Sequence, residues 1–360
     1  MSEQQRGLGA APRRAGLFGL IAFALIAFQP RSAPAGEPLR ISYQPSNWGV
    51  VFYVAVKEGF FNQVGLDTKS SVFQSGAPQV AAGASGAWDI GGAGDLPSLT
   101  GAARYGLLTI AFADTESKGN VLIATAALAN RVAADPSALS GQTIVWPTNS
   151  TGQWVAQTCL EKKYGLKSSE YHSINLDPGA INDALSSGRY ELAGTFDPFD
   201  FLLSAKIPAK VICTGEDVGI HVTSNLFVRL EYAKSHPDVV AKFLAVYFHT
   251  VAWAKMHPAD WYALAGEFYA ANGLSLAPEY VKLSITNRKY LTLAQELALF
   301  SGGESSEAAR WMRETNVFAK SAGIVRTMVD PKTYITDLYL SRVESDPRLK
   351  KFATSGSGKY

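Results

Sequence analysis

Short strand-like segments alternate with helix-like segments along the first two thirds of the chain. Residues 39–43 alternate apolar and polar side chains as a half-buried strand does, whereas residues 51–62 repeat their apolar side chains at the helical spacing. The same succession recurs up to residue 113 and again between residues 121 and 230. This alternation predicts parallel βαβ units in two successive sets.

Beyond Pro237 the pattern becomes almost wholly helical. In the two preceding sets we expect strands at 39–43, 68–73, 88–91, 107–113, 121–125, 142–146, 171–176, 191–196, 210–214 and 226–230, and helices at 51–62, 78–86, 96–105, 151–164 and 179–187.

Two α/β sets followed by helices fit an α/β fold of two lobes around a cleft. We expect residues 36–118 to form the first part of lobe 1, residues 119–218 to form lobe 2, and residues 219–360 to return to lobe 1 and end in C-terminal helices. The sequence leaves open whether the helices beyond Pro258 cover only lobe 1 or both lobes.

The first 35 residues have the pattern of a signal peptide. Arg13-Arg14 leads into the apolar run Leu17–Phe28, and Ala33-Pro34-Ala35 offers small residues at the spacing that signal peptidase recognises. We therefore expect cleavage near Ala35 and export from the cytoplasm. An uncleaved anchor and a twin-arginine signal remain alternatives.

Composition narrows the class of protein further. The chain has 360 residues, 47% hydrophobic and 18% charged, which excludes a disordered or collagen-like chain. Cleavage would remove four Arg and one Glu and leave 29 basic against 30 acidic residues. A nucleic-acid binder normally carries a clustered basic excess, so we expect no nucleic-acid partner.

Two cysteines, Cys159 and Cys213, are present. They could form a disulfide after export. Both lie in apolar surroundings, however, as buried free thiols usually do, and neither belongs to a CxxC motif. We therefore favour two buried thiols.

Motifs of common enzymes are missing from the sequence. There is no GxGxxG, no Walker A loop, no HExxH and no GxSxG. The five histidines show no metal-ligand spacing. We expect a protein that is not an enzyme and that carries no cofactor and no metal.

In open α/β sheets, ligands bind beyond the carboxyl ends of the strands, so the loops there are the candidate binding residues. Ser150 is a good N-cap before a helix, with Gln153 in the capping-box position. The same turn, with Thr151 and Gly152, could also offer free N–H groups to an anion.

The corresponding loops of the first set are Gln74-Ser75-Gly76 and the turn that contains Asp95 and Leu96. Asp95 could cap its helix or could hold an amine of a bound solute.

Phe196-Asp197 lies at the end of the strand expected at 191–196, and Phe196 with Trp48 could form an apolar pocket wall. Trp154 is a further aromatic candidate, whereas Phe199 and Phe201 are expected in the core.

Several short motifs resemble, in order and spacing, the periplasmic substrate-binding proteins of ABC importers for nitrate, sulfonates and taurine. The similarity runs from about Leu39 to Val343 and is carried by Ile41–Gln44, Lys57–Phe61, Val72–Gly76, Leu139–Gln142, Asp197-Pro198, Ser235–Val240, and Tyr290–Thr292 with Gln295. The last of these is similar to taurine-binding members in particular.

The resemblance implies a two-lobed type II periplasmic-binding-protein fold that closes on a small anionic or zwitterionic solute, as a monomer, and delivers it to an ABC permease and ATPase. Taurine binders of the family carry an acid where Ser224 stands here, and a Trp where Phe196 stands. Asp95 or Asp197 would then receive an amine if the ligand has one.

Another organic acid, a thiamine-pyrimidine precursor and a sensor subunit remain alternative readings of the same resemblance. Related enzymes of this fold carry a Cys-rich motif that is missing here, so the resemblance does not favour an enzyme.

Overall fold

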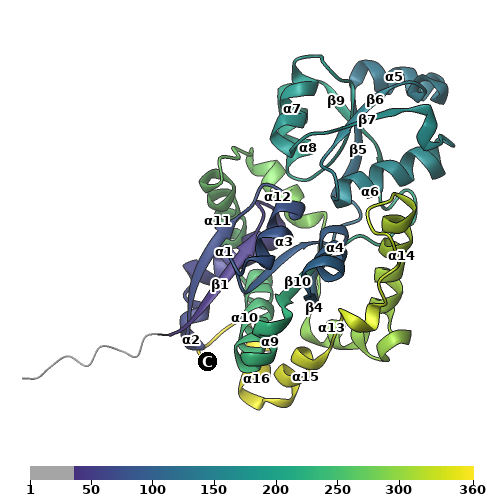
Figure 1. Cartoon of the computed structure of the whole chain (residues 1–360). Coiled ribbons are helices and arrows are strands. Elements are labelled where there is room, and N and C mark those ends of the chain that lie inside the picture. The colour runs from purple at the N-terminus through teal and green to yellow at the C-terminus, as the bar shows by residue number, and fades with distance from the viewer. Residues whose placement is uncertain (1–35) are drawn as a thin grey trace, which may run out of the picture. The chain divides into compact units, whose positions relative to one another are not determined.

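A computed structural model describes residues 36–360 of the chain. The expected signal peptide and its cleavage site lie outside these described residues. Within them the strands form two separate mixed sheets, which we call, with their helices, the first and the second lobe (Figure 1).

The sheet of the first lobe has the strand order β11-β4-β10-β3-β1-β2. Strands β1, β2 and β3 are parallel, as predicted, but β10 runs antiparallel between β3 and β4. Its strands are β1 (Glu37–Tyr43), β2 (Leu66–Val72), β3 (Ile90–Gly94), β4 (Leu107–Thr115), β10 (Thr223–Arg229) and β11 (Lys289–Tyr290).

The sheet of the second lobe has the order β7-β6-β8-β5-β9. Like the first sheet, it combines three parallel strands with an antiparallel strand inside the sheet. Strands β6, β7 and β8 are parallel, whereas β5 pairs antiparallel with both β8 and β9. Its strands are β5 (Asn120–Thr125), β6 (Thr143–Trp146), β7 (His172–Asn175), β8 (Leu192–Phe196) and β9 (Ala209–Thr214).

Most helices of the two lobes follow a strand. The first lobe has α1 (Asn47–Lys57), α2 (Phe60–Gln63), α3 (Gly76–Ala84) and α4 (Asp95–Tyr105), and the second has α5 (Ala126–Ala134), α6 (Thr151–Thr158), α7 (Pro178–Ser186) and α8 (Phe199–Lys206). The C-terminal part adds α9 (Leu230–Ser235), α10 (Pro237–Met256), α11 (Pro258–Ala271), α12 (Pro278–Thr286), α13 (Leu293–Phe300), α14 (Glu307–Ser321), α15 (Leu338–Ser345) and α16 (Pro347–Ser355).

Two expected helices differ in their bounds. The helix expected at 51–62 is divided into α1 and α2 because Gly59 adopts a left-handed conformation with φ 71°, which ends the first helix. The helix expected at 151–164 ends at Thr158 and continues as a π-helical turn, Cys159–Lys163.

Two neighbouring segments, residues 116–119 and 215–222, connect the lobes. They are hydrogen-bonded to each other: the Glu116 N–H donates to Val222 O at 2.8 Å, and the Val222 N–H donates to Ser117 Oγ at 3.1 Å. Paired crossing strands of this kind are suited to hinge motion.

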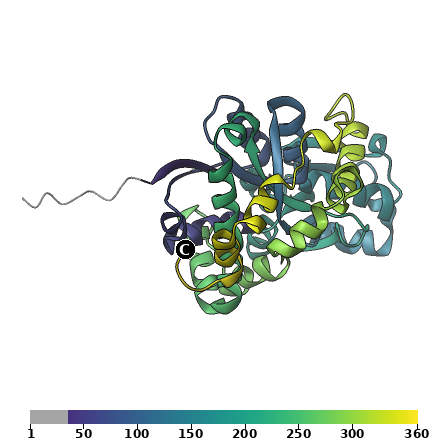
Figure 2. The same ribbon diagram turned by 90° about the horizontal axis from the view of Figure 1, so that it is seen from below.

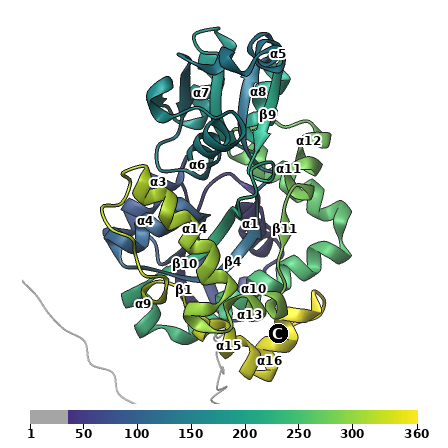
Figure 3. The same cartoon turned by 90° about the vertical axis from the view of Figure 1, so that its right-hand side faces the viewer.

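The C-terminal helices contact both lobes, which answers a question that the sequence left open. In Figure 2, the yellow C-terminal helices lie across the underside of the first lobe, and α15 and α16 pack on α10. Helix α14 runs beside α4 (Figure 3), and its Phe318 lies 5.9 Å from Trp154 of the second lobe, centroid to centroid. Tyr280 of α12 likewise stacks at 5.3 Å on Phe201 of the second lobe.

The two cysteines form a disulfide between the π-helical turn and β9, so the expectation of free thiols was wrong. The Cα atoms of Cys159 and Cys213 are 6.1 Å apart, within the range that a disulfide can bridge. Both residues are fully buried in an apolar core, and burial alone therefore did not distinguish a thiol from a disulfide.

No helix among residues 36–360 is both long and apolar enough to span a bilayer.

Candidate functional site

A small cavity of about 20 Å³ lies where the two lobes meet, at the ends of their strands. Five residues that the sequence singled out line it, namely Trp48, Gly76, Ser150, Thr151 and Phe196. The remaining lining residues are Gln44, Ser46, Gly94, Pro97, Glu116 and Arg288.

The amino end of α6 forms one side of this cavity. Ser150 is the N-cap, as predicted: its hydroxyl accepts the Gln153 N–H at 3.1 Å and donates to Pro147 O at 2.6 Å. The Gln153 side chain reaches one residue further back than a standard capping box and accepts the Asn149 N–H at 2.7 Å. The single proton of the Ser150 hydroxyl is therefore used within the cap and is not available to an anion.

Thr151 is the residue of this turn that remains available to a ligand. It is 6% exposed, lines the cavity, and its hydroxyl takes part in no hydrogen bond among the described residues. The first amides of a helix lack intrahelical acceptors and carry the positive end of the helix dipole. This side of the cavity can therefore bind an anionic group.

Gly94 lets the two lobes approach each other at this point. A Cβ atom on Gly94 would lie 2.5 Å from Thr151 Cγ2, and real Cβ atoms do not come so close to another carbon. A second contact between the lobes joins the Asn149 side chain, which donates to Thr100 Oγ1 at 2.8 Å. The lobes are thus in a closed arrangement.

Trp48 and Phe196 supply apolar walls on opposite lobes. Trp48 packs edge-to-face on Phe52 at 6.1 Å, and Phe196 packs in the same way on Phe199 at 5.6 Å, centroid to centroid. These contacts hold both rings in place before a ligand arrives, which favours tight binding of an apolar group.

A buried ionic cluster forms the base of the cavity. Arg288, whose side chain is 1% exposed, lies between α12 and β11 and contacts three carboxylates. It pairs with Asp114 of β4 at 3.3 Å, with Glu116 of the connection between the lobes, and with Asp197 of the second lobe. One guanidinium therefore joins both lobes and one of their connections.

Burial raises the pKa of Asp114 to about 7 and that of Asp197 to about 6, although Arg288 opposes both shifts. Burial likewise raises the pKa of Asp95 and Asp200 well above their usual values. These carboxyl groups are therefore harder to ionise than free ones, even though Asp114 and Asp197 share the guanidinium of Arg288.

Seven predicted site residues do not line the cavity. Gln74 is exposed, Leu96 is in the core, and Ser75 is the N-cap residue of α3. Asp95 is fully buried against α14, where its carboxylate accepts the Thr315 hydroxyl at 3.2 Å. Gly152 packs against the backbone of Thr195. Asp197 is hydrogen-bonded to Arg288, and Ser224 is buried in β10.

Sequence reasoning missed Gln44, Glu116 and Arg288 as site residues. Glu116 lies two residues before the boundary between the lobes that the sequence predicted at residues 118–119, and a charged residue next to that boundary was the only signal available there. Arg288 had no comparable signal, because 172 residues separate it from Glu116.

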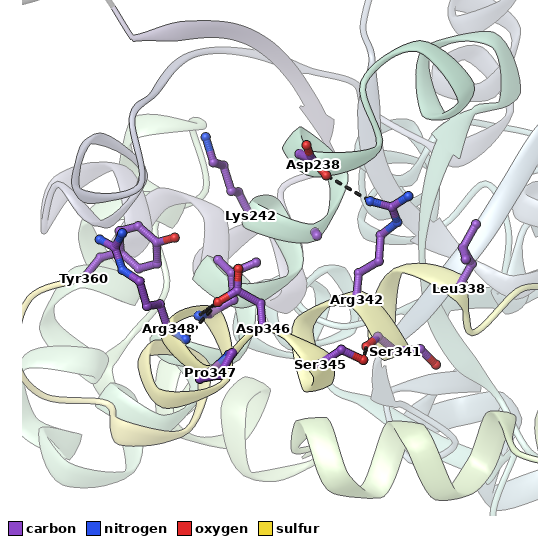
Figure 4. A pocket seen from close by; sticks show the side chains of 12 residues that line it. Asp238, Lys242, Leu338, Ser341, Arg342, Ser345, Asp346, Pro347, Arg348 and Tyr360 are labelled. Carbon is purple, nitrogen blue, oxygen red and sulfur yellow. Dashed lines mark hydrogen bonds and ion pairs between the residues drawn. The ribbon is translucent and has the colours of Figure 1, made fainter.

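A larger hollow of about 920 Å³ lies among α10, α15 and α16, away from the cavity (Figure 4). Its charged groups mostly satisfy one another: Arg342 pairs with Asp238 at 2.9 Å, Asp346 caps α16, and Arg348 lies 4.7 Å from the centre of the Tyr360 ring. Among residues 36–360 no group of three or more His, Cys, Asp or Glu side chains is arranged to hold a metal ion.

Comparison with known proteins identifies the family. Residues 49–261 match the sequence profile described as NMT1/THI5 like, and this range covers more than half of the chain. The chain belongs to the NMT1/THI5-like family. The resemblance proposed from the sequence motifs is thereby confirmed.

One relative of this NMT1/THI5-like chain is the taurine-binding periplasmic protein of Escherichia coli (strain K12). The two are 26% identical over 326 residues, which cover 89% of this chain and 97% of the relative.

Two solved structures are similar to the fold. The alkanesulfonate-binding protein of Xanthomonas axonopodis pv. citri, bound to MOPS, has a TM-score of 0.69 at 18% identity and covers 85% of this chain and 99% of its own. The periplasmic nitrate-binding protein of Synechocystis PCC 6803 has a TM-score of 0.69 at 12% identity and covers 90% and 92%. The predicted two-lobed periplasmic-binding-protein fold is confirmed.

Proposed function

We propose that this protein is a periplasmic receptor that captures a small organic solute with an acidic group, such as taurine or an alkanesulfonate, by closure of its two lobes. It then delivers the solute to the permease and ATPase of an ABC importer. It acts as a monomer and catalyses no reaction.

The observation that carries this proposal is the closed contact between Gly94 and Thr151. It brings the amino end of α6, on the second lobe, against the loops of the first lobe and encloses a cavity at that point. A site that is assembled from two lobes exists only in the closed form, so a solute that bridges the lobes stabilises that form.

The chemistry of the lining supports a solute with an anionic head and a short apolar part. The Thr151 hydroxyl and the free amides of α6 suit sulfonate or carboxylate oxygens. The buried hydroxyl of Ser46, which has no hydrogen-bond partner among the described residues, adds a donor from the first lobe. Trp48 and Phe196 provide apolar surface for the carbon atoms.

Relatives and fold neighbours support the same class of solute. They include a taurine-binding and an alkanesulfonate-binding protein, and two of them are described as periplasmic. The cavity of about 20 Å³ is smaller than any of these solutes, so binding requires that the lobes open and close again around the solute.

A thermal-shift screen of residues 36–360 tests this function. The panel holds taurine, alkanesulfonates, MOPS, short carboxylates, nitrate and the thiamine pyrimidine. A solute at 100 times its dissociation constant stabilises the folded state by about 2.7 kcal/mol, which shifts the melting temperature measurably. A protein that none of these solutes stabilises would contradict the proposal.

The variant Thr151→Phe tests the position of the site. The larger side chain fills the cavity, so we expect loss of binding in calorimetry with an unchanged circular dichroism spectrum. The control is Ser187→Phe, at an exposed position of the same lobe, which should bind as the wild type does. Wild-type affinity of Thr151→Phe would show that the solute binds elsewhere.

A further inference from the structure

The base of the cavity lacks positive charge. Three carboxylates, those of Asp114, Glu116 and Asp197, share the single guanidinium of Arg288. Uncompensated carboxylates are costly to bury, so a cation that enters this region gains electrostatic energy.

Glu116 is the carboxylate of this cluster that a solute can reach. It lines the cavity, whereas Asp114 and Asp197 are fully buried behind it. One oxygen of Glu116, Oε2, pairs with Arg288, while Oε1 lies 3.5 Å from the position that a Cβ on Gly94 would occupy.

The amino end of α6 faces the same point from the other lobe. Thr151 Oγ1 lies 3.2 Å from that same Cβ position on Gly94. The cavity is therefore polarised over a short distance, with the positive end of a helix dipole on one side and an anionic carboxylate on the other.

Arg288 does not serve as the partner of the solute's anionic group. Both of its terminal nitrogens are bonded to carboxylates, and only Nε has no partner among the described residues. Its guanidinium partly neutralises the cluster and holds Glu116 at the base of the cavity.

From this geometry we infer that the solute is a short zwitterion, whose acidic group binds at the amino end of α6 and whose ammonium group binds Glu116 Oε1. This inference rests on the proposed function and narrows its class of solutes. The sequence gave this role to Asp95 or Asp197. The inference assigns it to Glu116, because Glu116 lines the cavity whereas Asp95 and Asp197 do not.

Calorimetry with matched solutes tests the inference. Taurine is compared with ethanesulfonate and β-alanine with propionate, so that each pair differs by one ammonium group. A charge-assisted contact in a buried site makes the wild type bind the ammonium-bearing solute about tenfold to a hundredfold more tightly.

The variant Glu116→Gln should remove most of this preference because it weakens the binding of taurine. Its affinity for ethanesulfonate should stay within about twofold of the wild-type value, since ethanesulfonate has no ammonium group to contact the carboxylate. Asp95→Asn is the matched control, because it replaces another buried carboxyl group near Glu116 without changing the cavity lining, and it should keep the preference. The melting temperature of each ligand-free variant reports folding, and Glu116→Gln should not lower it because it relieves repulsion among the carboxylates.

The outcomes separate the inference from the proposed function. Equal affinities for the members of each pair, or a preference that survives Glu116→Gln, would overturn the inference while the receptor function stands. A preference lost in Asp95→Asn instead would assign the ammonium contact to Asp95. Failure of every member of the panel, MOPS included, to bind the wild type would overturn the proposed function and the inference together.

Discussion

Closure of the lobes depends on the missing side chain at Gly94, and the variant Gly94→Ala isolates that dependence. The new Cβ would lie 2.5 Å from Thr151 Cγ2 and 3.2 Å from Thr151 Oγ1. Carbon atoms pack favourably at about 3.5–4.0 Å, so the closed lobes would have to separate by about 1 Å at this point. The backbone itself accepts alanine, because Gly94 has φ −56°.

The expected cost falls on the closed form, since the contact crosses from one lobe to the other. Overpacking by one methyl group in a well-packed region costs about 1–3 kcal/mol. The apparent dissociation constant should therefore rise by a factor of about 5 to 150. The stability of the ligand-free protein should fall by no more than about 1 kcal/mol, the preference for glycine over alanine at an N-cap.

Calorimetry with the tightest-binding solute of the panel measures this effect. Gly179→Ala is the matched control, because a Cβ there meets nothing within 4 Å and should leave affinity unchanged. Adding Thr151→Ser to Gly94→Ala removes the clashing methyl group and keeps the hydroxyl, so the double variant should regain most of the affinity. Wild-type affinity of Gly94→Ala, or no recovery in the double variant, would refute the closure argument.

Two further predictions concern stability. The disulfide Cys159–Cys213 spans 54 residues. Loop entropy predicts that replacing both cysteines with alanine lowers the free energy of unfolding, measured in urea, by about 4 kcal/mol. A decrease of less than about 1 kcal/mol would contradict this prediction. The pKa of Asp114 is raised to about 7 from 3.8, so its ionisation opposes folding, and the free energy of unfolding should fall as pH rises from about 4 to about 7. The variant Asp114→Asn leaves Arg288, Glu116 and Asp197 in place. In urea titrations its free energy of unfolding should fall less between pH 5 and pH 8 than that of the wild type. An equal fall would refute the assignment of this pH dependence to Asp114.

Much of the fold was predictable because it depends on local pattern. The strand expected at 121–125 is β5, Asn120–Thr125, and the helix expected at 96–105 is α4, Asp95–Tyr105. Two strands, β5 in the second sheet and β10 in the first, run antiparallel to their neighbours, and this direction was not predictable in the same way. The direction of such a strand depends on where the chain crosses between the lobes rather than on the strand's own residues.

Only the part of the site that depends on neighbouring residues in the sequence was predictable. Ser150 and Thr151 carry a capping pattern that the sequence shows directly, and the structure brings them to the cavity. Arg288 and the pairing of Cys159 with Cys213 are long-range contacts, separated from their partners by tens to hundreds of residues. No periodicity within a window of one helix or strand encodes such contacts.

The two sides of the cavity have different structural origins, and this difference bears on how specificity changes in such a fold. The side that we propose to bind the acidic group follows from topology, because helices that succeed parallel strands present their amino ends at the carboxyl edge of the sheet. The carboxylate side follows from single residues, Glu116 in a connection between the lobes and Arg288 in the C-terminal part. Substitutions at these two positions can change whether a solute needs an ammonium group while the acidic group keeps its place at α6. One scaffold can thus serve amine-bearing and amine-free acids with few changes away from its helix amino ends.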